Sequence, residues 1–460
     1  MSGETSERDA VETGVISMYV KSRVHSRRRA PFDCEKGLPY VEVVDGGEVV
    51  ENCFPPQPTS PGGVRISSTL IHSKLVRNQF LLERVSRISN LPEDVERGGE
   101  VYQVEKMKAE HVIIGAGISG LTALKKEGGV LIASDTYTDT FLDPLNPMKE
   151  KAKSILKEMG DKVIQGDFLG KFSEGYAFRI GKKIVVFEDS RITFAMGGRY
   201  LPPRFEGNDL PGVISRDMYL RFRENYRDVL VLGSCDDAVR TAVVSGSRIL
   251  IAPRGTDLMS PVGKEMAEDH GIHLQGVTYL NVTVKGRKLY ASWDDGETLV
   301  DAVVFAPVKQ PRLEGIANVG CDYKFVPGMG AYIPEHDDEG YMECGHRVVG
   351  GARGIDDPSL SEASVEDSLR GKIQGPLRFY YEGGGKADPY NYGGGGYACM
   401  CEDVMWEDVL KFREFGNVEM LKRVSGICLG ECQGKTCSFV VGSLMKSDKL
   451  ITFRSPLYPV

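Results

Sequence analysis

The ten residues HVIIGAGISG at positions 111–120 decide the fold class of this chain. The apolar run 112–114 is typical of a short buried strand, and it leads directly into a glycine-rich turn. Apolar residues at helical spacing follow from Leu121. A strand, a tight glycine turn and a helix in this order predict the first unit of an α/β domain that binds a dinucleotide or an adenine nucleotide.

Each glycine of this turn has a physical reason. Gly115 allows the sharp turn, Gly117 lets the backbone approach a pyrophosphate, and Gly120 lets the helix pack against the strand. The helix N-terminus then presents free N–H groups and a positive dipole to the phosphates. A glycine-rich turn without a ligand is the alternative. The cofactor-binding residues predicted in the turn are Gly115, Ala116, Gly117, Ile118, Ser119 and Gly120.

Two further strand ends are expected to border the same site. The strand 130–133 ends at Ser134 and Asp135, and an acidic side chain at this offset from the glycine turn accepts hydrogen bonds from ribose hydroxyls. Another predicted strand, 192–195, is followed by Gly197, where backbone without a side chain can pass close to a cofactor. Ser134, Asp135 and Gly197 therefore join the predicted nucleotide site.

A second unit with the same plan begins at the predicted strand 229–232. Its glycine signature is eroded, because Cys235 and Ala238 stand where the second and third glycines belong. Asp236 and Asp237 lie where the phosphates would approach, and two carboxylates repel a pyrophosphate. We interpret this unit as a Rossmann-like domain that no longer binds NAD.

Composition excludes several classes of protein. The chain has 460 residues, enough for about three domains, with 41% hydrophobic and 27% charged residues. Lys plus Arg number 57 and Asp plus Glu 65, a formal charge of -8, so no basic field attracts nucleic acid. The first thirty residues lack the apolar region of a secretory signal, and no apolar run is long enough to span a membrane. We expect a cytoplasmic protein with no nucleic-acid partner and no membrane span.

Five of the ten cysteines lie between positions 399 and 437. Cys399 and Cys401 form a C-x-C pair, and Cys432 and Cys437 form a C-x4-C pair, so four thiolates could hold one iron–sulfur cluster. Zinc is the competitor, although its usual loops are C-x2-4-C, and a site without metal is the third alternative. Cys428 falls outside both pairs and is expected to be a core thiol.

These patterns predict an α/β protein with two Rossmann-like domains and a small helical iron–sulfur domain. A short antiparallel insertion is expected at 175–188, and the glycine-rich stretch 383–396 is interpreted as a flexible linker, with a helix beginning at Glu402. A strand pair is expected near 40–50. The predicted parts are 1–108, of unassigned or degenerate ferredoxin-like fold; 109–210 with 331–392, the nucleotide domain; 211–330, the degenerate NAD-type domain; and 393–460, the cluster domain.

Four motifs occur in order along the chain: GAGISG at 115–120, GRYLPP at 198–203, NDLPGV at 208–213, and CMC at 399–401 with GECQGKTC at 430–437. This order resembles the alpha subunits of heteromeric dye-linked amino-acid dehydrogenases. That family includes proline and hydroxyproline dehydrogenase, opine oxidase and the related sarcosine oxidase alpha chains. The segment 393–460 is also similar to the 2Fe-2S domain of bacterioferritin-associated ferredoxin. The resemblance covers roughly residues 105–440.

The resemblance implies a pyridine nucleotide-disulfide reductase-like fold, with FAD or an adenine nucleotide such as ATP at the first fingerprint. It also implies a beta subunit whose flavin oxidises the amino acid, an FMN shared with that subunit, and an external electron acceptor. A Gly-Asp pair expected near the flavin ribityl chain is replaced here by Gly350 and Gly351, which we add to the predicted cofactor site. The ligands implied for the 2Fe-2S cluster are Cys399, Cys401, Cys432 and Cys437.

Three functions compete on this evidence. The leading hypothesis is an electron-transfer subunit of an amino-acid dehydrogenase complex, inactive alone, because no Ser/His/Asp arrangement or other catalytic residue can be assigned. The second is a self-contained NAD(P)H-dependent FAD oxidoreductase, which requires an intact second nucleotide site. The third is a nucleotide-stabilised scaffold subunit without catalysis.

Overall fold

The computed structural model describes residues 103–457, except 135–138, 211, 287, 356, 366–387, 401, 403, 430–431 and 456, together with four short strands of the first 102 residues. These four strands form one sheet in the order β1-β3-β2-β4. The predicted strand pair near 40–50 is confirmed, because β2 and β3 pair antiparallel. The bounds are β1 Glu4–Thr5, β2 Tyr40–Val43, β3 Val49–Asn52 and β4 Val64–Arg65.

A five-stranded parallel sheet is the base of the predicted nucleotide domain. Its order is β26-β12-β6-β7-β8, and β6 is buried along its whole length, which explains its apolar sequence. Helix α5 (Ile118–Glu127) joins β6 to β7 and packs against α7 (Lys149–Met159) in one apolar cluster. The strands are β6 His111–Ile114, β7 Val130–Ala133, β8 Val163–Gln165, β12 Arg191–Phe194 and β26 Arg347–Val348.

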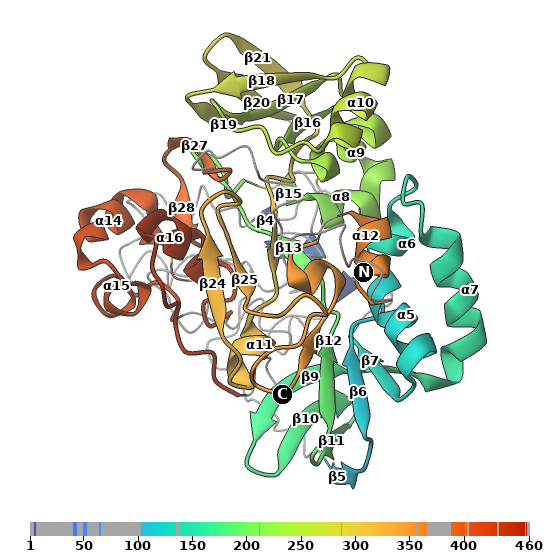
Figure 1. Ribbon diagram of the computed structural model, residues 1–460. Helices are drawn as coiled ribbons and strands as arrows, with labels where there is room; N and C mark the ends of the chain where they lie inside the picture. The colour runs from blue at the N-terminus through green and yellow to red at the C-terminus, as the bar shows by residue number, and fades with distance from the viewer. Residues whose placement is uncertain are drawn as a thin grey trace.

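A smaller sheet takes three of its four strands from the chain between β8 and β12. The predicted antiparallel hairpin is confirmed as β10 (Gly175–Ile180) and β11 (Lys183–Phe187), which pair directly. Strands β9 (Asp167–Phe172) and β5 (Gln103–Met107) flank this pair in the order β5-β11-β10-β9. Figure 1 shows this sheet at the end of the molecule opposite the second Rossmann-like unit.

The second predicted unit is a five-stranded parallel sheet in the order β15-β22-β16-β17-β18. As expected, β16 leads through Gly233 into a helix that begins at Asp236. A three-stranded antiparallel sheet, β19-β20-β21, is formed by the chain between β18 and β22 of this parallel sheet. The strands are β15 Val213–Ser215, β16 Val229–Leu232, β17 Ile249–Pro253, β18 His273–Val277, β19 Leu280–Lys285, β20 Lys288–Trp293, β21 Gly296–Val300 and β22 Ala302–Phe305; the helices are α8 Arg216–Phe222, α9 Asp236–Ser245 and α10 Pro261–Asp269.

The C-terminal cysteine region is a group of short helices beside the body of the molecule (Figure 1). Its helix α16 docks on β25, where Tyr332 donates to the Ser447 carbonyl oxygen at 2.7 Å. The elements are β28 Tyr397–Cys399, β29 Val404–Met405, α14 Trp406–Lys411, α15 Val418–Ser425 and α16 Cys437–Met445. The first of these helices thus begins at Trp406, four residues later than predicted, because β29 precedes it.

Part of the predicted linker is ordered structure. Residues Asn391–Gly394 form β27, which pairs in parallel with β14 (Arg204–Phe205). Tyr390 and Tyr392 are buried, so the segment carries core side chains between its glycines. The glycines suit the path, because a Cβ on Gly396 would lie 2.1 Å from the Phe205 carbonyl oxygen. The interpretation as a flexible linker is therefore wrong for 388–396, and 383–387 lie outside the described residues.

Short elements connect the two units and the cysteine region. Strand β13 (Gly198–Tyr200) pairs antiparallel with β23 (Lys309–Pro311). A disulfide joins Cys321 to Cys344. No helix among the residues described is long and apolar enough to cross a membrane. The remaining elements are α6 Asp139–Leu142, α11 Glu314–Asn318, β24 Tyr323–Val326, β25 Ala331–Pro334 and α12 Pro358–Ala363, with short 3-10 turns at Gly160–Lys162, Arg223–Asn225, Gly350–Arg353 and Arg413–Phe415.

Candidate functional site

The glycine turn between β6 and α5 has the geometry that its sequence predicts. Gly115 has a φ of +112°, and a Cβ there would lie 2.4 Å from the Ala195 carbonyl oxygen. A Cβ on Gly120 would lie 1.9 Å from the Gly115 carbonyl oxygen, so helix and turn touch at this point. Gly117 differs, because the nearest atom to its Cβ position is Thr140 Oγ1 at 3.7 Å. Gly115 and Gly120 are needed for close packing, whereas Gly117 leaves open room for a ligand.

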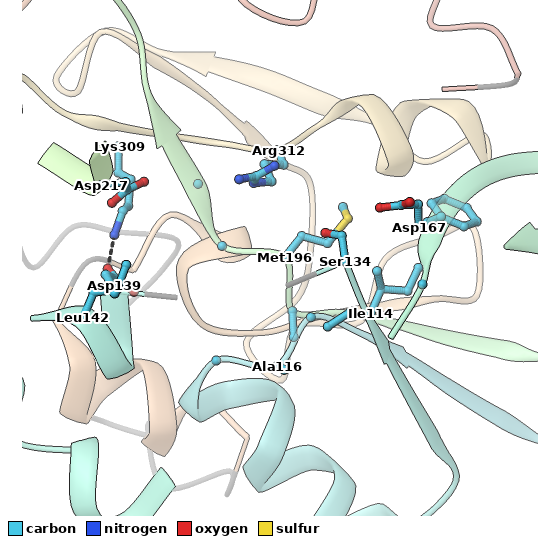
Figure 2. Close-up of a pocket in the computed structure, with 18 of the residues that line it drawn as sticks. Ile114, Ala116, Ser134, Asp139, Leu142, Asp167, Met196, Asp217, Lys309 and Arg312 are labelled. Atoms are coloured by element: carbon cyan, nitrogen blue, oxygen red, sulfur yellow. Dashed lines mark hydrogen bonds and ion pairs between the residues drawn. The ribbon is translucent and has the colours of Figure 1, made fainter. Parts of the chain in front are cut away.

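A pocket opens at this turn, over the carboxyl ends of the parallel strands (Figure 2). A crevice at this edge of an open parallel sheet is where nucleotides bind in such folds. Five predicted residues line it: Gly115, Ala116, Gly117, Ser134 and Gly197. Asp135 lies outside the described residues.

The other predicted residues support the pocket without lining it. Ile118, Ser119 and Gly120 are buried in the first turn of α5, and Ser119 donates to the Ser361 carbonyl oxygen at 2.9 Å. A Cβ on Gly350 would lie 2.0 Å from Ser119 Oγ, and one on Gly351 would lie 3.2 Å from Gly197 Cα. Gly350 and Gly351 therefore let the segment that contains them pack closely against α5 and against Gly197.

Several charged residues of the pocket were not predicted. They come from strands, helices and loops that are far apart in sequence, and the sequence around each residue carries no signal that links it to the glycine turn. In retrospect, Lys309 and Arg312 follow the apolar strand β22, the kind of position that borders a site in an open parallel sheet. The unpredicted charged residues are Asp139, Asp167, Asp217, Arg221, Lys309 and Arg312.

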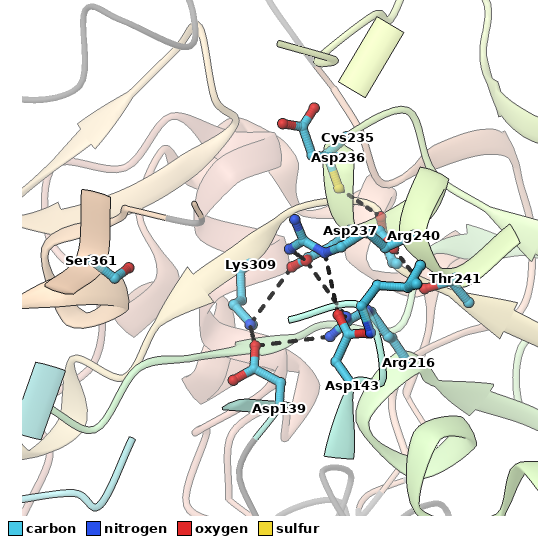
Figure 3. A network of polar contacts seen from close by, with 12 residues as sticks. Asp139, Asp143, Arg216, Cys235, Asp236, Asp237, Arg240, Thr241, Lys309 and Ser361 are labelled. Carbon is cyan, nitrogen blue, oxygen red and sulfur yellow. Dashed lines mark hydrogen bonds and ion pairs between the residues drawn. The ribbon is translucent and has the colours of Figure 1, made fainter. Parts of the chain in front are cut away.

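The pocket wall is joined to a buried ionic network (Figure 3). Lys309 forms ion pairs with Asp139 and, at 3.6 Å, with Asp237. Burial opposes the charge on Lys309, but the two carboxylates outweigh it and raise its pKa above the usual value. The lysine therefore stays protonated. Its ion pairs connect Asp139, which lines the pocket, to Asp237 in the second unit.

Asp237 is the centre of this network. It accepts hydrogen bonds from Tyr200 and Arg240, and Arg216 lies 3.8 Å away. Burial disfavours the Asp237 carboxylate, but the surrounding cations hold its pKa well below the usual value. Arg216 also donates to Asp143 at 2.5 Å, and both side chains are 1% exposed. The network therefore joins α6, α8, α9, β13 and β23, so that both Rossmann-like units contribute to one buried set of charges.

The N-terminus of α9 is occupied by contacts within the protein. Asp236 accepts from the Ser260 backbone N–H at 2.8 Å and from Ser260 Oγ at 2.5 Å. Cys235 Sγ donates to the Ala306 carbonyl oxygen at 3.2 Å. Because both carboxylates of the first turn already have partners inside the protein, the arrangement favours the interpretation that this unit no longer binds NAD.

A second cavity is lined by three buried cysteines, Cys399, Cys432 and Cys437, together with Pro202 and Met400. Contacts with neighbouring thiols, and burial, raise the pKa of Cys437 well above the usual value. The fourth predicted ligand, Cys401, lies outside the described residues. Within the part of the chain that the structure describes, no group of three or more His, Cys, Asp or Glu side chains is arranged to hold a metal ion.

Comparison with known proteins gives the fold. No family model matches the sequence, and no curated protein matches it. The structure resembles the crystal structure of an L-proline dehydrogenase from P. horikoshii, with a TM-score of 0.56, 19% identity, and coverage of 78% of this chain and 80% of that one. At this level of identity, the likeness establishes a shared α/β fold.

Two reductases give weaker matches. A T. acidophilum thioredoxin reductase is 12% identical over 58% of this chain and 99% of its own, with a TM-score of 0.44. An NAD-dependent persulfide reductase from A. fulgidus is 14% identical over 60% of each chain, also with a TM-score of 0.44.

Proposed function

We propose that this chain is the electron-transfer subunit of an amino-acid dehydrogenase complex, with FAD or an adenine nucleotide at the glycine turn and a 2Fe-2S cluster at the C-terminal cysteines. Electrons taken from an amino acid at a partner's flavin leave through this chain to an external acceptor. A flavin supplies two-electron chemistry, and an iron–sulfur cluster supplies one-electron steps. The shared fold with an L-proline dehydrogenase supports the choice of reaction class.

One observation carries this proposal. Gly198 lines the nucleotide pocket, and Pro202 lines the cysteine cavity. Four residue steps separate their Cα atoms, so the two sites border the ends of one segment at most about 14 Å long. A relay needs two redox sites close together, and the position of the two pockets at the ends of one short segment supports that role.

Each site supplies residue types that the proposed group would use. At the glycine turn, Gly117 leaves room for a pyrophosphate at the N-terminus of α5, and Arg221 and Arg312 line the same pocket. At the second site, Cys399, Cys432 and Cys437 would supply thiolates from β28, from the turn before α16 and from α16 itself, with Cys401 as the fourth. Their burial would keep solvent from the cluster.

The alternative of a self-contained NAD(P)H-dependent oxidoreductase is not favoured. It needs a second nucleotide site, and the carboxylates at the start of α9 bind Ser260, Arg240 and Tyr200 instead. A scaffold without catalysis predicts a bound nucleotide that never changes its redox state.

Cofactor analysis of the purified full-length chain tests the proposal. We expect about two iron atoms and two acid-labile sulfides per chain, little zinc, and a released nucleotide that mass spectrometry identifies as FAD or an adenylate. Co-expression with a candidate flavoprotein beta subunit should give dye reduction with proline, hydroxyproline or sarcosine. Stoichiometric zinc without iron, or NADH-driven reduction of the isolated chain, would overturn the proposal.

A further inference from the structure

The segment between the two sites carries a buried arginine. Arg199 lies on β13, between Gly198 of the nucleotide pocket and Pro202 of the cysteine cavity, and is 3% exposed. Pairing with β23 fixes its backbone, since Arg199 lies opposite Gln310. A buried guanidinium requires a compensating charge, so the partners of this side chain must be specific.

Arg199 uses the two ends of its guanidinium for two different partners. Its Nη2 forms an ion pair with Glu314, the first residue of α11, which is 2% exposed. Its Nη1 donates to the Lys435 carbonyl oxygen at 2.7 Å. The carboxylate neutralises the guanidinium, and the carbonyl contact connects β13 to the turn between Cys432 and Cys437.

That turn has an unusual backbone. Gln433 and Gly434 both have positive φ values, +50° and +76°. Within the turn, Lys435 folds back so that its Nζ donates to the Cys432 carbonyl oxygen at 3.1 Å, and its side chain is buried. The contact from Arg199 reaches this turn from outside the C-terminal region, at the residue two positions before Cys437.

We propose that Arg199 is a positioning residue that holds the turn Cys432–Cys437 in place beside the nucleotide pocket. This inference rests on the proposed function, and it assigns to β13 the role of fixing the separation of the two redox sites. An arginine suits this position because its planar fork presents N–H donors on separate nitrogens to a carboxylate and to a carbonyl, whereas the three donors of a lysine all lie on one nitrogen.

A matched control exists within the chain. Arg347 is also 3% exposed, forms an ion pair with Glu127, and donates through Nε to the Glu339 carbonyl oxygen at 3.0 Å. It joins a carboxylate to a backbone carbonyl as Arg199 does, but it contacts neither site. Arg347→Lys therefore measures the general cost of weakening a buried arginine bridge.

The test compares Arg199→Lys, Arg199→Gln and Arg347→Lys in the full-length chain. Alkylation of Cys432 and Cys437 in reduced, iron-free protein is followed by peptide mass spectrometry, with circular dichroism as the check of folding. We expect both cysteines to react about tenfold faster in Arg199→Lys than in the wild type, because the turn opens more often. Arg347→Lys should react at the wild-type rate.

Iron content of the protein as purified is measured in parallel. Arg199→Lys should lose most of its iron and keep its nucleotide, and Arg199→Gln should do the same if it folds. Equal alkylation rates in Arg199→Lys and Arg347→Lys would overturn the positioning role, whatever the iron content. A wild-type chain without iron, combined with fast alkylation of Arg199→Lys, would overturn the proposed function and leave the positioning role supported.

Discussion

The Sγ atoms of Cys428 and Cys437 lie 3.4 Å apart in the buried C-terminal region. Cys428 was expected to be a core thiol outside the ligand pairs, and it is buried, with a left-handed backbone at φ +66°. Its Sγ contacts a proposed ligand, but Cys428 does not line the cavity that the other three cysteines share. The contact makes it a neighbour of the proposed cluster.

We predict that Cys428→Ser retains the cluster and that Cys432→Ser loses it. The serine hydroxyl can keep a hydrogen bond to Cys437, whereas loss of Cys432 removes one of four thiolates. Iron content and the visible absorption of the two purified variants give the measurement. Loss of iron from Cys428→Ser, with iron retained in Cys432→Ser, would show that the ligand set is wrong.

Gly117→Glu should release the nucleotide. The substitution places a negative side chain in the open space where the backbone is proposed to meet a pyrophosphate. Gly160→Glu is the matched control, because it adds the same charge at an exposed helix end with no atom within 4 Å of the new Cβ. Nucleotide content after gel filtration is the readout, and full retention by Gly117→Glu would contradict the assignment.

Asp237→Asn should destabilise the protein by about 3–5 kcal/mol, because it leaves Arg216, Arg240 and Lys309 buried without their shared carboxylate. Urea unfolding at pH 7 measures the effect. Asp408→Asn, which weakens an exposed pair with Lys411, should leave the midpoint unchanged.

The effect of Asp237→Asn should also depend on pH. Because the pKa of Asp237 is lowered in the folded state, its contribution to stability is complete above the unfolded value of about 3.9 and falls as the pH drops below it. The difference in unfolding free energy between wild type and variant should therefore narrow below about pH 4. A difference that stays constant from pH 7 to pH 3 would contradict the role of the carboxylate.

The second unit should not bind NADH tightly. Its two carboxylates are engaged at the start of α9, where a pyrophosphate would need free N–H groups and no negative charge. Titration calorimetry of the full-length chain with NADH should show no micromolar binding. Tight binding that disappears on substitution of Gly233 would refute this prediction.

The isolated chain should not oxidise amino acids. It supplies two proposed redox sites, but no residue can be assigned as a substrate base. Dye reduction with proline, hydroxyproline or sarcosine should therefore require the partner flavoprotein. Activity of the lone chain, or its purification from the native source as a solitary monomer, would show that the relay is mistaken.

Local patterns were enough to predict the two βα units. The apolar strands β6, β7 and β16, the turn glycines and the start of α9 all depend on neighbours within a few residues, so their signals are present in the sequence. The cysteine pairs are likewise local. The fold class and the glycine turn could therefore be predicted before the structure was known.

Tertiary structure alone decided which residues meet. One pocket is lined by residues from separate segments, among them Lys309, Arg221 and Asp139. No local sequence pattern indicates that these segments meet. The glycines around β27 suggested flexibility, yet Tyr392 is buried because β14 supplies a partner strand from nearly two hundred residues away. The sequence around Arg199 does not distinguish it from other arginines in strands. Its role depends on its contacts with Glu314 and the Lys435 carbonyl oxygen, which only the tertiary structure brings together. Sequence periodicity predicts which residues of a helix or strand face the core. Ion pairs and the residues that line a pocket depend instead on packing between elements that are distant in the chain.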